Sequence, residues 1–333
     1  MEGQVWTDKP ILSPEQLLSH RIRRSGNFCG ALILAMYTMQ FLISLLWSLG
    51  LQWKLLQPDT WGVVGNELAD MAIYLLFLVV PAVLVVLISG LRVPPFPTRR
   101  IHPTRFVCLV CIGMAVAVFA NVAAAYVLMW MEQFGLQASS SSYAVDPSVE
   151  GLILSLISTA VLPALVEEMI FRGFFLGALR PFGNGMAVVL SAVTFGLFHG
   201  NVQQFVFTCF FGLILAFLTV QTGSIWPAVV THFCNNAMSV LLTYASNFYS
   251  DAMDNAVTVT TFALVCVAGM VGAGVLLCTD RGSTAREDVF RPMGNSIGLF
   301  TPAKRLGYLF TAPLWLIAVV VLLWDVRGTV SFA

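Results

Sequence analysis

Charged side chains are scarce in this sequence. Of 333 residues, 10% are charged and 58% are hydrophobic, whereas a soluble globular chain has about 25% charged and about 45–50% apolar residues. The 17 lysine and arginine residues balance the 17 aspartate and glutamate residues, so no net charge attracts nucleic acid or another polyanion. The composition predicts a polytopic membrane protein whose surroundings are the lipid bilayer and which does not bind nucleic acid.

Several familiar catalytic and cross-linking patterns are also missing. The seven cysteines lie in or at the ends of apolar runs, and Cys108 and Cys111 have no second cysteine pair or nearby histidine to complete a zinc site. The motif HExxH is absent, and no serine or cysteine lies beside a basic partner in a recognisable arrangement. A disulfide framework, a zincin and a covalent peptidase mechanism therefore have no support.

Long apolar runs, by contrast, are abundant. A membrane-spanning helix needs about 20 such residues, and the sequence predicts an all-α fold: a polytopic integral membrane bundle of about nine transmembrane helices. Seven long runs and two shorter ones carry this prediction. They lie near residues 28–50, 69–91, 106–131, 151–179, 225–246, 256–278 and 307–324, with the shorter ones at about 186–198 and 202–220.

The basic residues predict the orientation of these helices. Cytoplasmic loops carry an excess of lysine and arginine. If the N-terminus is cytoplasmic, fourteen of the seventeen basic residues fall on that side, Lys54 and Arg327 fall on the other, and Arg172 lies inside the membrane. We therefore expect a cytoplasmic N-terminus.

Two carboxylates and an arginine interrupt the run "ALVEEMIFRGFF" at residues 164–175. A charge near the bilayer centre costs a few kcal/mol, so such groups pair or line a cavity. Glu168 and Arg172 are four residues apart on one helix face and can form an ion pair that only fixes packing. Glu167 points about 100° away, so it needs another partner or a water-filled site.

Two histidines and an asparagine are predicted at the same depth. His199 ends the short run that contains Phe195, and His232 and Asn236 share one face of the run 225–246. Counted along their helices, these groups and Glu167 lie roughly 12–20 Å below the cytoplasmic surface. The sequence thus predicts one polar intramembrane site, with a cavity that opens toward the cytoplasm.

These residues carry a family resemblance. "EEMIFR" fits the pattern EExxxR, "FGLFH" fits FxxxH and "HFCNN" fits HxxxN, in the order found in the CPBP family of intramembrane proteases. That family includes the CAAX prenyl endopeptidases and the bacterial, Abi-type bacteriocin self-immunity proteins. The likeness implies a membrane-embedded endopeptidase that acts on a peptide or membrane-protein substrate, and we expect it in the plasma membrane of a prokaryote.

Four regions are expected on this interpretation. They are a cytoplasmic N-terminal segment (1–27), N-terminal transmembrane helices (28–150), a catalytic core (151–246) and C-terminal transmembrane helices (247–333).

The catalytic roles follow from the need for a nucleophile and for stabilisation of an oxyanion. We assign Glu167 as the base that activates water with His199 beside it, and His232 with Asn236 as donors to the oxyanion; the resemblance implies the same arrangement. Glu168 and Arg172 are expected to support them. A zinc ion held by Glu167, His199 and His232 is the alternative at this stage, with His232 then a ligand.

A different class of function also has to be considered. In a transporter or a non-catalytic scaffold, Glu167 and the histidines would form a proton relay. Transporters commonly show repeated halves with interrupted helices in matching positions, whereas this polar core occurs once in the sequence. The three motifs together favour the peptidase.

Overall fold

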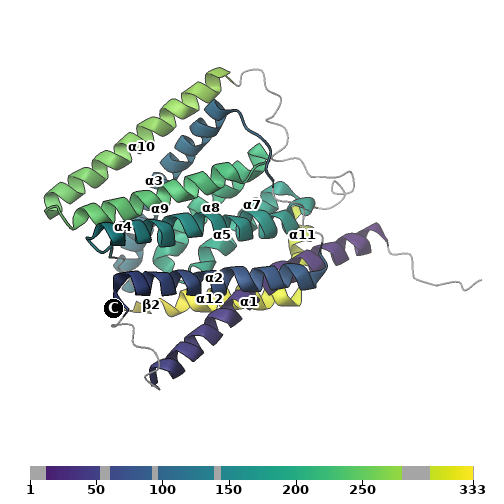
Figure 1. Cartoon of the computed structure of the whole chain (residues 1–333). Helices are drawn as coiled ribbons and strands as arrows, with labels where there is room; N and C mark the ends of the chain where they lie inside the picture. The colour runs from purple at the N-terminus through teal and green to yellow at the C-terminus, as the bar shows by residue number, and fades with distance from the viewer. Residues whose placement is uncertain (1–12, 53–60, 92–96, 139–143, 280–300, 333) are drawn as a thin grey trace, which may run out of the picture.

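The computed structural model describes residues 13–52, 61–91, 97–138, 144–279 and 301–332. Most of the long helices run side by side (Figure 1). They are α1 (Pro14–Gln52), α2 (Gly62–Ser89), α3 (Pro103–Gln133), α7 (Asn184–Phe198), α8 (Val202–Thr222), α9 (Trp226–Ser246), α10 (Asp251–Thr279) and α12 (Pro313–Gly328). A short helix, α11 (Pro302–Leu309), precedes α12.

The span between α3 and α7 is built from shorter pieces. Two π-helical segments, η2 and η3, alternate with α-helix, and a 3-10 turn closes the span. In order, the pieces are α4 (Val149–Ser155), η2 (Leu156–Val161), α5 (Leu162–Glu168), η3 (Met169–Phe175), α6 (Leu176–Leu179) and η4 (Arg180–Phe182).

The prediction of an all-helical membrane bundle is confirmed in its coarse form. Each of the nine predicted runs is helical in the described residues. Within the described ranges, six helices are long and apolar enough to cross a bilayer, or seven if α11 and α12, which meet at 87°, form one span. The remaining two runs are α7, with 15 residues, and α9, which carries the polar residues of the site. The count of nine crossings stays a prediction.

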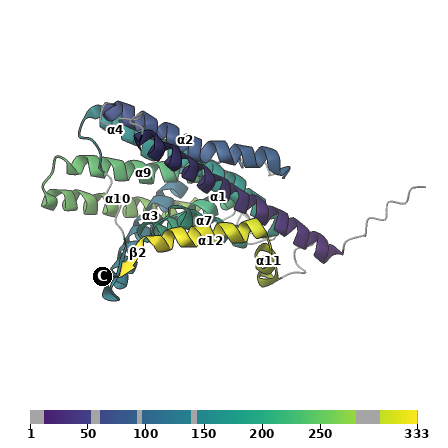
Figure 2. The same ribbon diagram turned by 90° about the horizontal axis from the view of Figure 1, so that it is seen from below.

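The helices pack into two edges around a central group. At one edge α10 lies along α3, and at the other α1 lies between α2 and α12 (Figures 1 and 2). Gly30 permits the close contact of α1 with α12, because a β-carbon there would lie 2.3 Å from the backbone of Leu314. Small residues allow membrane helices to approach in this way.

Basic residues tie several loops together at one end of the bundle. The Arg24 guanidinium donates to the carbonyl of Gly90 at the end of α2 (2.8 Å), and Arg305 donates to the carbonyl of Phe182 (3.0 Å). The backbone N–H of Arg99 donates to the carbonyl of Gly223, which precedes α9 (3.0 Å). We call this the basic end. Lys9, Arg92 and the arginines of 280–300 lie outside the described residues.

The opposite end is held by different contacts. Asn247, after α9, donates through its side chain to the carbonyl of Val145 (3.0 Å). Two strands of three residues, β1 (Leu136–Ala138) and β2 (Val330–Phe332), pair antiparallel there. The sequence did not predict this small sheet, which joins the end of α3 to the end of α12.

Candidate active site

The two adjacent carboxylates lie at the end of α5, between the two π-helical segments. Pro163, in the first turn of α5, has no N–H to donate to the carbonyl four residues earlier, which belongs to Thr159. The side chain of Asn236 on α9 donates to that carbonyl instead (3.0 Å). π-Helical turns interrupt α-helices most often at functional sites, and here they flank the acidic pair.

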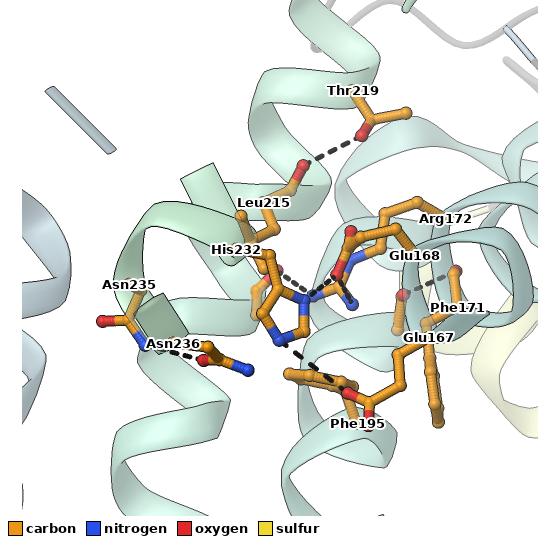
Figure 3. Close-up of polar contacts among 12 residues, drawn as sticks. Glu167, Glu168, Phe171, Arg172, Phe195, Leu215, Thr219, His232, Asn235 and Asn236 are labelled. Atoms are coloured by element: carbon orange, nitrogen blue, oxygen red, sulfur yellow. Dashed lines mark hydrogen bonds and ion pairs between the residues drawn. The ribbon is translucent and has the colours of Figure 1, made fainter. Parts of the chain in front are cut away.

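Glu168 is the centre of a buried ionic cluster (Figure 3). Its Oε1 accepts hydrogen bonds from Arg172 Nη1 (3.0 Å) and from His232 Nδ1 (2.9 Å), and the side chains of Glu168 and Arg172 are fully buried. Arg172 also donates to the carbonyl of Gly212 on α8 (3.2 Å). The predicted ion pair is confirmed, and the bond from His232 to the same oxygen was not foreseen.

Glu167 points in a different direction from Glu168, as the helical offset predicts. Its Oε1 accepts a hydrogen bond from the hydroxyl of Tyr74 on α2 (2.8 Å). Its Oε2 lies 3.9 Å from His232 Nε2, which is too far for a hydrogen bond. One carboxylate is therefore neutralised by a cation, while its neighbour has a phenol and an imidazole around it.

The hydrogen-bond partners of the two histidines fix which nitrogen carries a proton. His232 Nδ1 faces Glu168 Oε1, and His199 Nδ1 faces the carbonyl of Phe195 (2.7 Å). The carbonyl oxygen and the ionised, arginine-paired carboxylate act as acceptors, so both Nδ1 atoms are the donors. Nε2 is then the nitrogen that each ring offers to a substrate or water.

Phe195 explains the aromatic position of the motif FxxxH. The Arg172 guanidinium carbon lies 4.3 Å from the centre of its ring, and the rings of His199 and His232 both meet it edge to face, at 4.7 and 6.0 Å between centroids. A cation over an aromatic face is attracted by the ring quadrupole. One side chain thus packs against the arginine and both histidines.

A cavity of about 780 Å³ reaches the site. Glu167, His199, His232 and Asn236 all line it, so the four residues predicted to act together share one cavity. In the described part of the chain, His199 makes no hydrogen bond to Glu167 or to His232. All three line the cavity, and the two histidines also share the Phe195 ring.

This cavity extends away from the basic end, whereas the sequence reasoning placed its opening on the side of the basic residues. Its walls extend along α9 from His232 to Ser246, the last residue of that helix, and include Asp254 in the first turn of α10. Both helix ends lie opposite the basic end. Counting residues along a helix gives the depth of a group, but the packing of side chains decides on which side space remains.

The zinc arrangement considered from the sequence does not form. Two imidazole Nε2 atoms and a carboxylate are ligands that zinc accepts. However, among the residues that the structure describes, no three histidine, cysteine, aspartate or glutamate side chains are grouped closely enough to share one ion.

Sequence reasoning missed three residues of the site. Tyr74 lies far away in the chain, with no motif around it. Gly212 lies in an ordinary apolar run, yet a β-carbon there would come within 3.1 Å of Ala192 and 3.3 Å of Arg172 Nη2. Asn235 donates to the side-chain oxygen of Asn236 (3.1 Å) and could have been suspected from the pair "NN".

The segment that carries this site resembles a known protein family. Residues 149–238 match the family described as type II CAAX prenyl endopeptidase Rce1-like. This segment is similar to that family. The matched segment contains the glutamates, the arginine, the histidines and Asn236 of the site, whereas Tyr74 lies outside it. The buried Glu/His cluster is consistent with an active site.

One curated relative extends the likeness. The Bacillus subtilis protein named "Putative membrane peptidase YdiL" is 26% identical over 166 residues, which is 48% of this chain and 68% of the relative. No solved structure matches the chain significantly.

The buried pair makes a stability prediction. Replacing Arg172 with alanine leaves the Glu168 carboxylate without its cation, and a buried charge stripped of its partner typically costs about 3–5 kcal/mol. We expect Arg172→Ala to lower the melting temperature of the purified protein in detergent by several degrees, measured by intrinsic fluorescence. Arg327→Ala, at an exposed position, is the matched control, and equal melting of the two variants would show that the pair contributes nothing.

Proposed function

We propose that this protein is an intramembrane endopeptidase in which Glu167 activates water. The observation that carries the proposal is the difference between the two adjacent glutamates. Glu168 is fully buried and paired with Arg172, whereas Glu167 lines the cavity and faces His232 Nε2 across 3.9 Å. A water can bridge two polar groups that are too far apart for a direct hydrogen bond, and here that water would meet a carboxylate able to take its proton.

The proposed reaction is hydrolysis of a peptide bond. Glu167 removes a proton from the water, the resulting hydroxide attacks the carbonyl carbon, and a tetrahedral oxyanion forms. The C–N bond then breaks, the carbonyl re-forms as a carboxylic acid, and Glu167 returns the proton to the departing amine. His199, on the same cavity wall, helps to orient the water through Nε2.

Asn236 and His232 are the proposed oxyanion donors. An asparagine amide has two hydrogens; one is given to the Thr159 carbonyl, and the other is available to a substrate in the cavity. The Nδ1–H of His232 is held by Glu168, so this ring can donate to an oxyanion only through Nε2, after that nitrogen has accepted a proton. Donors fixed before the reaction stabilise developing charge without reorganisation, and Glu168, Arg172 and Phe195 provide that fixation.

The proposed substrates are membrane-associated peptides or membrane-protein segments, including prenylated or CaaX-like ends and peptide precursors. The Rce1-like match to residues 149–238 supports this class. We further propose that the nine helical runs cross the bilayer with the N-terminus in the cytoplasm, because the basic end then obeys the positive-inside rule. We also propose that the protein is an enzyme of the plasma membrane of a prokaryote.

Substitution of the base tests the proposal. We expect Glu167→Gln to reduce the rate of peptide hydrolysis at least about 100-fold, because general-base catalysis contributes about 10²–10⁴. Insertion and melting temperature should stay near those of the wild type. Glu150→Gln, an exposed change in the same span, should keep full activity. Near-normal hydrolysis by Glu167→Gln would remove this residue from the mechanism.

Tyr74 is proposed to orient the base from outside the family core. Its hydroxyl donates to Glu167 Oε1 at 2.8 Å, leaving Oε2 to face His232. Loss of one hydrogen bond to a charged group costs about 1.5–3 kcal/mol. Tyr74→Phe should therefore lower kcat about tenfold or more with little change in KM, while Tyr126→Phe, at an exposed position of α3, should not. An unchanged kcat for Tyr74→Phe would show that the bond has no part in catalysis.

A further inference from the structure

A stripe of polar residues on α9 leads from the site to the end of the bundle opposite the basic end. His232, Asn236, Ser239, Thr243 and Ser246 all line the cavity, and their spacing of four, three, four and three residues places them on one helix face. Polar groups at membrane depth face a water-filled cavity rather than lipid. The α9 wall of the cavity is therefore polar, while other walls, including Phe207 and Phe262, are apolar. We call the space along this polar wall the passage.

The far wall of the passage carries one formal charge. Asp254 and Thr258 of α10 are one helical turn apart and both line the cavity. Apart from the histidines, the ionisable lining residues are Glu167 and Asp254, and no lysine or arginine of the described chain is among the lining residues. A substrate carboxylate would have no lysine or arginine to pair with in this passage, whereas a positively charged group could pair with Asp254.

The position of Asp254 is not explained by its helix alone. An acidic residue in the first turn interacts favourably with the helix dipole, and Asp251 occupies the same turn of α10. Asp251 is exposed and does not line the cavity, whereas Asp254 is half-buried and does. The two residues share the helix-dipole effect and differ in whether they face the passage.

We propose that the peptide substrate enters from the end opposite the basic end and carries a positive charge about six residues from the bond that is cleaved. This rests on the proposed function. From His232 to Ser246 is about 21 Å along α9 at 1.5 Å per residue, and an extended peptide covers that length in about six residues at about 3.3 Å each. The charge is a lysine, an arginine or an α-amino group that pairs with Asp254. With the N-terminus in the cytoplasm, this entrance faces the outside of the cell.

The charge of the passage can be measured without any substrate. A cysteine introduced as Thr243→Cys would report it, in a background where the five cysteines that are not buried are changed to serine and the buried Cys29 and Cys108 are kept. The probes are a cationic and an anionic methanethiosulfonate reagent. We expect the cationic reagent to react faster, and Asp254→Asn to lower the cation-to-anion rate ratio about fivefold or more.

The matched control decides whether that charge acts inside the passage. Asp251→Asn removes the same charge from the same helical turn and should leave the ratio within about twofold of the parent. An equal fall in both variants, or no fall with Asp254→Asn, would overturn the charge assignment. Ser239→Cys serves as a second reporter deeper on the same stripe if Thr243→Cys fails to fold.

Sidedness is read with the same membrane-impermeant reagents. Thr243→Cys should be labelled in intact cells, and His20→Cys, an exposed position near the basic end, only in inside-out vesicles. Labelling of Thr243→Cys only in inside-out vesicles would overturn entry from outside.

Cleavage separates this inference from the proposed function. Three otherwise identical peptides carry lysine, norleucine or glutamate six residues from the central bond, and each is given to the purified full-length protein. We expect the lysine peptide to be cleaved at least about fivefold faster than the norleucine peptide, and Asp254→Asn to remove most of that preference. Cleavage without a preference for lysine contradicts the inference and leaves the endopeptidase standing. If the wild-type protein cleaves none of the peptides, or cleaves them no faster than Glu167→Gln does, the proposed function is contradicted. The substrate assignment, which rests on it, is then contradicted too.

Discussion

The buried carboxylate of Glu168 is the constraint on which the rest of the site depends. An ionised group at membrane depth must be compensated, and here Arg172 and His232 both bind the same oxygen. Arg172 is itself held by the Gly212 carbonyl and the Phe195 ring. The cluster thereby joins α5, α7, α8 and α9 at one point and turns Nε2 of His232 toward Glu167.

The interruption of the α-helix in the span that carries the two glutamates also helps to hold the site in place. An uninterrupted α-helix would bond the Thr159 carbonyl internally, but Pro163 cannot supply the N–H, and Asn236 takes that acceptor. A helix-breaking residue is tolerated in a membrane because a neighbouring helix satisfies the carbonyl. Pro163 thus interrupts the acidic helix, and the Thr159 carbonyl to which it cannot donate helps to position Asn236.

Much of the site could be predicted from the sequence because its groups are related by helical periodicity. The pairing of Glu168 with Arg172, the separate direction of Glu167, and the common face of His232 and Asn236 all follow from 3.6 residues per turn. Contacts between helices do not: the bond from Tyr74, the bond from His232 to Glu168 and the carbonyl of Gly212 depend on tertiary packing. The direction in which the cavity extends from the site could not be predicted for the same reason, since periodicity does not say where side chains leave space.

The protonation of His232 tests the central claim most directly. The account requires a proton on Nδ1, because that atom donates to the Glu168 carboxylate, and it leaves Nε2 as the nitrogen that faces Glu167. Nitrogen-15 NMR of histidine-labelled protein in lipid, with the His232 signals assigned by their loss in His232→Gln, measures both nitrogens. The account predicts a protonated Nδ1 across the working pH range. A neutral ring with its proton on Nε2 and a bare Nδ1 would contradict it.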